Sequence, residues 1–272
     1  MGDLKISTWN INSVRLRIDQ VLKFLLQHQP DVLCLQEIKC REQQFPAKAL
    51  AEAGWPHMAI AGQKGSHGVA AVSRRPLSRL PSHDFCRQGD ARHVSVLVDG
   101  VEVHNFYVPA GGDEPDPAIN PKFDHKLDFL DRMRAYFAMR AQENPDNRLV
   151  ITGDLNVAPG EFDVWSHKQL LNVVSHTPVE TDALNRVLAS HDFLDLARHA
   201  MPEPARLFTW WSYRARDWRA SNRGRRLDHI WVSPALATTS AGTGEGERFI
   251  IHDETRDWTK PSDHCAVTAL LR

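Results

Sequence analysis

Acidic side chains stand beside several short apolar runs of this 272-residue sequence. They are Glu37, Asp154, Asp228 and Asp263, and Asn10 and Asn12 occupy the same position after the first run. A carboxylate next to a sheet core costs desolvation free energy unless a cation or a donor compensates for it. Each acid alone could cap a loop or pair with an arginine, but several together predict one shared cation. Oxygen and amide ligands without cysteine favour Mg²⁺, with Mn²⁺ as a substitute, over zinc.

One histidine is distinguished by its acidic neighbours. His264 directly follows Asp263 before the last apolar run, and Asp228 offers a second carboxylate from elsewhere in the chain. A carboxylate can hold an imidazole in one tautomer, so that the free nitrogen meets an anionic oxygen or moves a proton. The adjacent acid together with the further carboxylate distinguishes His264 from the other histidines, so it is the candidate for this chemistry.

A basic and aromatic stretch leads into Asp228. It runs from Trp210 to Arg226, with six arginines from Arg214 onward against one acid. Arginines bind phosphates through paired hydrogen bonds, and flat rings pack on sugars or unstacked bases. The alternative is a solvated charged loop over a tryptophan-lined core. The position of this stretch directly before Asp228 favours the interpretation that it forms a wall of the site.

Apolar periodicity predicts the elements that carry these residues. Alternation predicts a strand over Leu4–Trp9, helical spacing follows from Ile18 until Pro30, and Val32–Leu35 is a buried strand. Further strands are expected at 57–61, 69–73, 93–98, 101–108, 149–152, 227–232 and 266–271. Helices are expected at 123–141 and 182–189, the second with Thr181 as its N-cap. Asp99-Gly100 predicts a hairpin turn, and the mixture of helices and hairpins favours a layered α/β fold.

The composition sets limits on class and partners. Hydrophobic residues make up 42% of the chain, enough for a continuous core, and the formal net charge is −1. No chain-wide positive charge attracts nucleic acid or membrane, so a polyanion must be held by a local patch. The four cysteines form no C-x-x-C pair, which excludes a disulfide framework and a zinc ribbon.

The chain shows no sign of a second domain or of a membrane anchor. No internal repeat or linker divides it, so we expect a single domain over 1–272, with 110–121 as a functional surface loop. The glycine-rich 242–246 lacks a preceding apolar strand and is not taken as a nucleotide-binding turn. No signal segment or long apolar stretch is present. We therefore expect a cytoplasmic protein without a membrane partner.

Seven short motifs occur in one order along the chain. They are TWNIN (8–12), LQE (35–37), KGSHGVA (64–70), NFYVP (105–109), GDLN (153–156), NRGRRLD (222–228) and KPSDH (260–264). In this order the sequence resembles the exonuclease III family of abasic-site (AP) endonucleases, within the endonuclease/exonuclease/phosphatase superfamily. The resemblance covers the chain from residue 4 to its end. It implies a four-layered α/β sandwich of two packed mixed β-sheets flanked by helices.

The resemblance also implies an activity. The family cleaves double-stranded DNA on the 5′ side of an abasic site and depends on Mg²⁺. It has 3′→5′ exonuclease and 3′-phosphatase or phosphodiesterase activities on blocked 3′ ends, in base excision repair. We accordingly expect a monomeric DNA repair nuclease. One rival is a superfamily phosphatase or phosphodiesterase acting on a non-DNA phosphate ester, and another is a binding module that has lost catalysis.

Residue roles follow by position from the resemblance. Glu37 is the implied principal ligand of the metal. The residues implied in or beside the metal shell are Asn10, Glu37, Asp154, Asn156, Asp263 and His264. The implied catalytic residues are Tyr107, Asp154, Asn156, Asp228 and His264. The implied DNA contacts are Lys122, Trp210, Asn222, Arg223, Arg225 and Leu227, with Trp210 and Leu227 lining the pocket for the base-less sugar.

Two residues depart from the family pattern, and the identity of the general base stays open. Ala110 stands where many relatives carry an Asn or Gln that touches DNA, and Arg225 occupies a position that is aromatic in some. The general base is either Asp154 or the His264–Asp228 pair, and the sequence leaves both alternatives.

Overall fold

The computed structural model describes residues 2–240 and 249–271, so the glycine-rich 242–246 lies outside the described residues. A first six-stranded mixed sheet has the order β13-β14-β1-β2-β4-β3, in which β1 and β2 are parallel. Its strands are β1 (Leu4–Asn10), β2 (Val32–Gln36), β3 (His57–Ala61), β4 (Val69–Ser73), β13 (Phe249–His252) and β14 (Ala266–Leu271).

A second six-stranded mixed sheet has the order β5-β6-β7-β8-β12-β9, in which β7 and β8 are parallel. Its strands are β5 (Ser78–Arg79), β6 (His93–Val98), β7 (Val101–Tyr107), β8 (Leu149–Asp154), β9 (Leu194–Asp195) and β12 (Asp228–Val232). The hairpin predicted at Asp99-Gly100 joins β6 to β7, and both turn residues have positive φ. A separate two-stranded ribbon pairs β10 (Trp210–Trp211) with β11 (Gly224–Arg225).

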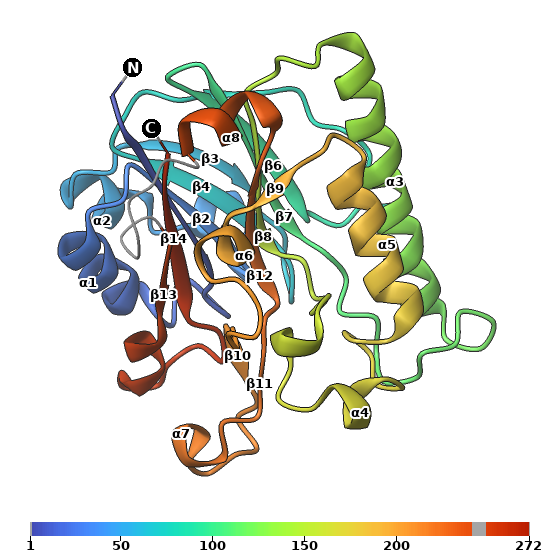
Figure 1. Cartoon of the computed structure of the whole chain (residues 1–272). Helices are drawn as coiled ribbons and strands as arrows, with labels where there is room; N and C mark the ends of the chain where they lie inside the picture. The colour runs from blue at the N-terminus through green and yellow to red at the C-terminus, as the bar shows by residue number, and fades with distance from the viewer. Residues whose placement is uncertain (1, 241–248, 272) are drawn as a thin grey trace.

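The two sheets face each other and helices cover their outer faces (Figure 1). Ile6, Val103 and Ile230 belong to the apolar core between the sheets. The first sheet packs outward on α1 (Ile18–His28) and α2 (Ala47–Glu52), and the second on α3 (Pro121–Glu143) and α5 (Pro178–Ala189). The four-layered sandwich expected from the resemblance is thereby confirmed.

Short helices complete the described chain. They are α4 (His167–Leu170), α6 (Leu196–Ala200), α7 (Trp218–Ser221), α8 (Pro234–Ser240) and the 3₁₀ helices η1 (Glu42–Gln44), η2 (Glu161–Asp163) and η3 (Asp253–Asp257). The four cysteines are buried and free, in agreement with the sequence. None of the helices over residues 2–240 and 249–271 combines the length and the apolar character that crossing a membrane requires.

The predicted N-cap of α5 is wrong. The helix begins four residues earlier than expected, and its N-cap is Thr177 rather than Thr181. Pro178 takes the first helical position, and the Glu180 carboxylate accepts hydrogen bonds from both the backbone nitrogen and the hydroxyl of Thr177. Proline is favoured at this position because it needs no hydrogen-bond partner there. Thr181 lies inside the first turn.

Register brings polar strand ends to one end of the sandwich. Asn10 pairs with Gln36 across the parallel β1–β2 pair, which puts Glu37 beside Asn10. In the second sheet Asp154 pairs with Tyr107 on one side and with Asp228 on the other. The β10–β11 ribbon and α7 project at the end of the molecule away from both termini (Figure 1).

Candidate active site

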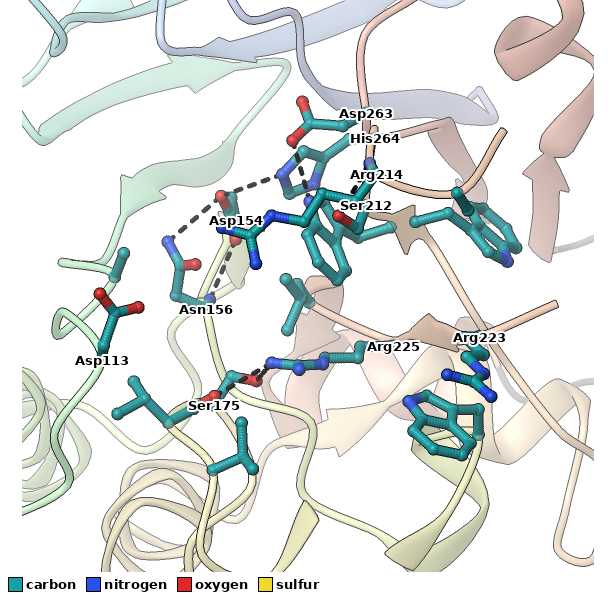
Figure 2. Close-up of a pocket in the computed structure, with 18 of the residues that line it drawn as sticks. Asp113, Asp154, Asn156, Ser175, Ser212, Arg214, Arg223, Arg225, Asp263 and His264 are labelled. Atoms are coloured by element: carbon teal, nitrogen blue, oxygen red, sulfur yellow. Dashed lines mark hydrogen bonds and ion pairs between the residues drawn. The ribbon is translucent and has the colours of Figure 1, made fainter. Parts of the chain in front are cut away.

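A cleft of about 970 Å³ opens where these strand ends meet. Its described lining includes the polar side chains Glu37, Tyr107, Asp154, Asn156, Asp263 and His264. The rest of the wall comes from the loop after β7, from the segment around Trp165 and from residues 173–175 and 210–227. Figure 2 shows Asp154, Asn156 and His264 close together at one side of the cleft, with Arg225 and Ser175 at the other.

Glu37 lies directly after β2, where its φ is 48°. Its Oε1 accepts hydrogen bonds from Asn10 Nδ2 at 3.0 Å and from the Tyr107 hydroxyl at 2.9 Å. Its Oε2 lies 3.0 Å from Lys39 Nζ, which also donates to Asn12 Oδ1 at 2.6 Å. The carboxylate thus contacts both sheets and a cation.

Asp154 ends β8 and is buried. The preceding residue, Gly153, has a φ of 131°. A Cβ at this position would collide with a backbone carbonyl oxygen of β7, so only glycine allows β8 to approach β7 this closely. Asp154 Oδ2 accepts from Asn10 Nδ2 at 2.8 Å, and Oδ1 accepts from the backbone nitrogen of Asn156 at 3.0 Å. Burial, with smaller contributions from Asp228 and Glu37, raises the pKa of Asp154 to about 7, although His264 opposes the rise.

His264 is held between two carboxylates. Its Nδ1 lies 2.8 Å from Asp228 Oδ2, and its Nε2 lies 3.7 Å from Asp154 Oδ2. The Thr209 hydroxyl donates to the same Asp228 oxygen at 2.6 Å. Burial would lower the pKa of His264, but the charges of Asp228 and Asp154 outweigh it and raise that pKa to about 10. The imidazole is therefore an imidazolium at neutral pH.

Two hydrogen bonds hold the Asp263 carboxylate in place. Its Oδ2 accepts from Trp210 Nε1 at 3.0 Å and its Oδ1 from Asn12 Nδ2 at 3.1 Å. Burial raises its pKa, but the charge of His264 and these two hydrogen bonds outweigh that effect, so the net pKa lies below its ordinary value. Asp263 is thus a carboxylate that donors orient toward the cleft.

The donor set fits a hard divalent cation. The cleft collects the carboxylates of Glu37, Asp154 and Asp263, and Asp228 Oδ1 is buried without a hydrogen-bond partner among the described residues. Donor atoms of Asp154, Asp228 and His264 lie within 4.8 Å of one another, close enough to hold an ion. The His264 Nδ1 is already engaged with Asp228, which leaves oxygens as the main ligands. Such a set suits Mg²⁺ or Mn²⁺.

Aromatic and basic side chains form the rim. Trp210 and Leu227 pack together with Trp165, and Trp210 also donates to Asp263. The guanidinium of Arg223 lies 4.7 Å from the centre of the Trp165 ring, and that of Arg225 lies 5.3 Å from the centre of Trp210. These stacked arginines present positive charge along an apolar wall.

A family model described as the Endonuclease/Exonuclease/phosphatase family matches residues 7–264. The chain belongs to this family. It is 29% identical to exodeoxyribonuclease III of Haemophilus influenzae, with 98% of this chain and 99% of that protein covered. The relatives include the metal-dependent nucleases of the exonuclease III and AP endonuclease type, and the chain is a phosphodiesterase of that type.

Solved structures agree with this membership. An AP endonuclease from Archaeoglobus fulgidus has a TM-score of 0.88 at 30% identity. A 3′ phosphatase from Neisseria, bound to a product DNA hairpin, has a TM-score of 0.86 at 32% identity. Each comparison covers 98% of both chains. The fold is therefore shared with these two proteins over nearly the whole chain.

In this family member most of the residues singled out from the sequence meet at the cleft. Asn10 and Asp228 lie directly behind the lining, hydrogen-bonded to Asp154 and His264. Two predicted DNA contacts are not among the described lining residues of the cleft. Lys122 is exposed in the first turn of α3, and Asn222, also exposed, ends α7 with a positive φ and accepts from Trp211 Nε1.

Arg225 differs from the prediction in its surroundings. It reaches across the cleft wall and donates to Ser175 Oγ at 2.7 Å and to the Val174 carbonyl at 3.0 Å (Figure 2). Both hydrogen bonds engage its Nη1 within the protein. Its Nε is buried without a hydrogen-bond partner among the described residues.

Several supporting side chains were missed by the sequence analysis. Lys39 pairs with Glu37, and Thr209 holds Asp228. The buried Lys126 donates to the backbone carbonyl of Asn156 at 2.8 Å and pairs with the buried Glu180. Lys39 follows the LQE motif closely enough to have been noticed. Lys126 and Glu180 occupy ordinary helical positions and carry no signal in the sequence.

Proposed function

We propose that this chain is a Mg²⁺-dependent AP endonuclease that hydrolyses the phosphodiester on the 5′ side of an abasic site in double-stranded DNA. The proposal includes 3′→5′ exodeoxyribonuclease and 3′-phosphatase or phosphodiesterase activity on blocked 3′ ends, in base excision repair by a monomer. The observation that carries it is one cleft that combines the catalytic acids Glu37 and Asp154 with the apolar wall of Trp210 and Leu227. The DNA hairpin bound to the Neisseria relative supports DNA as the substrate.

Asp154 is the proposed general base. A carboxyl group with a pKa of about 7 is matched to proton abstraction near neutral pH. Asn156 lies beside it and its Nδ2 donates to the Val108 carbonyl at 2.8 Å, which fixes the amide where it can align the attacking water. The alternative base, the His264–Asp228 pair, is disfavoured because an imidazole with a pKa of about 10 already carries its proton.

His264 and Tyr107 are the proposed donors to the phosphate. The His264 imidazolium offers a charge-assisted N–H from its Nε2 while Asp228 holds its Nδ1. Burial and then the charge of Glu37 raise the pKa of Tyr107 well above its ordinary value, so its hydroxyl keeps its proton, which would turn from Glu37 Oε1 toward the phosphate. Donors fixed in advance stabilise the charge that develops on the phosphate oxygens.

Glu37 is the proposed principal ligand of Mg²⁺, with Asn10, Asp154, Asn156, Asp263 and His264 in or beside the shell. Asn10 directs its Nδ2 at both Glu37 and Asp154, and so orients the two carboxylates. When bound, Mg²⁺ neutralises negative charge on the phosphate and assists departure of the 3′ oxygen.

The apolar wall provides the proposed selectivity. An abasic sugar can leave the helix at a lower unstacking cost than an intact nucleotide. Trp210 and Leu227 offer it a surface beside the catalytic groups, and Trp210 is itself anchored by Asp263. Lys122, Asn222, Arg223 and Arg225 would contact the strand backbone, which carries no base information.

The decisive experiment is cleavage of a labelled duplex that contains one abasic site. With Mg²⁺, wild type should cut 5′ to the site, whereas Asp154→Asn should lose turnover but keep its affinity for the duplex, because it loses an interaction made in the transition state. Asp182→Asn, an exposed carboxylate on α5, serves as the control. Near-wild-type kcat in Asp154→Asn would refute the mechanism. Faster turnover on soluble phosphate esters than on the duplex would favour the rival substrate class.

A further inference from the structure

Two histidines and a glutamate converge outside the cleft, at the edge of the first sheet. His28 is the last residue of α1, His252 is the last residue of β13, and Glu254 lies in η3. Figure 1 shows β13 beside α1, and the two imidazole centres are 4.1 Å apart. One ring nitrogen of each histidine and one carboxylate oxygen lie within 4.8 Å of one another. The end of α1 and the β13–η3 segment, which are distant in sequence, thus bring their donor atoms together.

The contacts within this group leave a donor atom unsatisfied. Glu254 Oε1 lies 3.3 Å from His28 Nε2 and 3.3 Å from His252 Nδ1. His28 Nε2 is shielded from solvent and has no hydrogen-bond partner among the described residues, so its contact with Glu254 lacks the alignment of a hydrogen bond. Glu254 Oε1 thus lies close to both ring nitrogens, and its contact with His28 is not a well-aligned hydrogen bond.

The far side of the His252 ring is fixed by a hydroxyl. Its Nε2 lies 2.8 Å from Thr268 Oγ1, which in turn lies 2.7 Å from Ser7 Oγ. When Nε2–H donates to Thr268, the lone pair of Nδ1 points at Glu254. Metal-binding histidines have this pattern, in which the outer ring nitrogen is held by a hydrogen bond while the inner nitrogen binds the ion.

The electrostatic environment keeps both imidazoles in the form that binds metal. Burial, assisted first by the neighbouring His28 and then by the charge of Lys5, lowers the pKa of His252 to about 3, and burial also lowers the pKa of His28. Neutral imidazoles are metal ligands, whereas imidazolium is not. Lys5 donates to the His28 carbonyl at 2.6 Å, and the Glu254 carboxylate is the opposing charge on the other side.

We propose that His28, His252 and Glu254 bind a transition-metal ion of the Zn²⁺ class, separate from the Mg²⁺ of the active site. Two imidazoles and one carboxylate suit Zn²⁺, whereas Mg²⁺ prefers oxygen ligands. The side chains of His28 and Glu254 are 25% and 47% exposed, which leaves an entry path and a position for water.

The ion would have a structural role. It would join α1, β13 and η3 at one point. Arg256 of η3 donates to the carbonyls of Trp211 at 3.2 Å and Ser262 at 2.5 Å, and Ser262 directly precedes Asp263. A metal at Glu254 would therefore stabilise the segment that leads from β13 to Asp263 and His264.

The test is a Zn²⁺ titration by calorimetry and thermal unfolding in excess Mg²⁺, which keeps oxygen sites occupied. Wild type should bind one Zn²⁺ with a rise in Tm. His28→Gln and Glu254→Gln, both at partly exposed positions, should each lower the affinity at least about tenfold and abolish most of the Tm rise. Two controls should behave as wild type. They are His199→Gln, an exposed histidine of α6, and Asp154→Asn in the cleft.

A second measurement does not depend on variants. Co²⁺ bound to wild type in place of Zn²⁺ should give the visible absorption bands of a nitrogen- and oxygen-coordinated ion, and Zn²⁺ should displace them. Unchanged Zn²⁺ affinity in both His28→Gln and Glu254→Gln would overturn the proposal. Loss of binding in Asp154→Asn instead would assign the ion to the active site and overturn it equally.

Discussion

Substitution of His264 and Asp228, singly and together, tests whether the two act as one unit. The imidazole is buried, its Nδ1 lies 2.8 Å from Asp228 Oδ2, and Thr209 holds that oxygen from the other side. His264→Ala removes the proposed donor to the phosphate. Asp228→Asn keeps the shape of the site but removes the charge that orients and protonates the ring.

The expected magnitudes follow from these contacts. Loss of a charge-assisted donor to the transition state costs about 10²-fold in kcat or more, which is about 2.7 kcal/mol. Asp228→Asn should produce part of that loss, about tenfold to 10²-fold, because the donor stays but is misoriented. Independent effects would multiply to about 10³–10⁴-fold. Since Asp228 acts through His264, the double variant should instead resemble His264→Ala alone.

The pH profile supplies a second readout. The Asp228 charge is the main force that raises the pKa of His264 to about 10 against the effect of burial, so the imidazolium persists across the neutral range. In Asp228→Asn this pKa should fall, and the active imidazolium should be lost as pH rises through a lower value. The basic limb of the kcat/KM profile should therefore move to lower pH, while His264→Ala should lack this limb.

Single-turnover cleavage of an abasic duplex across a pH series measures all four proteins, and thermal unfolding checks that each is folded. A double variant whose loss equals the product of the two single losses would refute the proposed unit. An unmoved basic limb in Asp228→Asn would refute its role in protonating His264.

Three further predictions concern the rim and the core. Trp210→Ala should lower kcat/KM on an abasic duplex more than it weakens binding to intact duplex. Arg223→Ala should instead weaken binding to both duplexes alike and reduce the salt dependence of Kd. The reverse result would exchange the roles of the two residues. Lys126→Met should lower the free energy of unfolding in urea by about 3–5 kcal/mol, because Glu180 loses its buried cation, and Glu180→Gln in the same chain should restore part of it. Gly153→Ala should cost about 3 kcal/mol or more in the same assay, and a smaller loss would show that β7 can move aside.

The strands were predictable because their signal is local. The predicted ranges 57–61, 69–73, 93–98 and 266–271 coincide with the observed strands. The strand predicted to end at Thr152 continues through Gly153 and Asp154. These two residues belong to the strand because they pair with β7 on one side and with β12 on the other. Apolar alternation along the sequence carries no information about this pairing. Apolar spacing also placed the start of α5 too late in the sequence. The start of this helix is decided by a proline and a glutamate, which apolar spacing does not take into account.

The candidate site was predictable where motifs carry it and not where support comes from a distance. The GDLN and KPSDH motifs single out Asp154 and His264 from the sequence alone. Lys126 and Glu180 lie 54 positions apart and meet only because α3 and α5 pack side by side. The same holds for His28 and Glu254, which share no motif and contact each other only across packed segments.

The sequence alone establishes which chemical groups stand at the strand ends. It therefore predicts that carboxylates, amides and one imidazole are available to form the site. Their protonation states came from the folded molecule. Burial raises the pKa of Asp154 to about 7, and two nearby carboxylates raise that of His264 to about 10. Both shifts depend on desolvation and on distances of a few ångströms between residues from different strands. Such distances exist only once the sheets are packed, so the assignment of base and donor rests on tertiary structure.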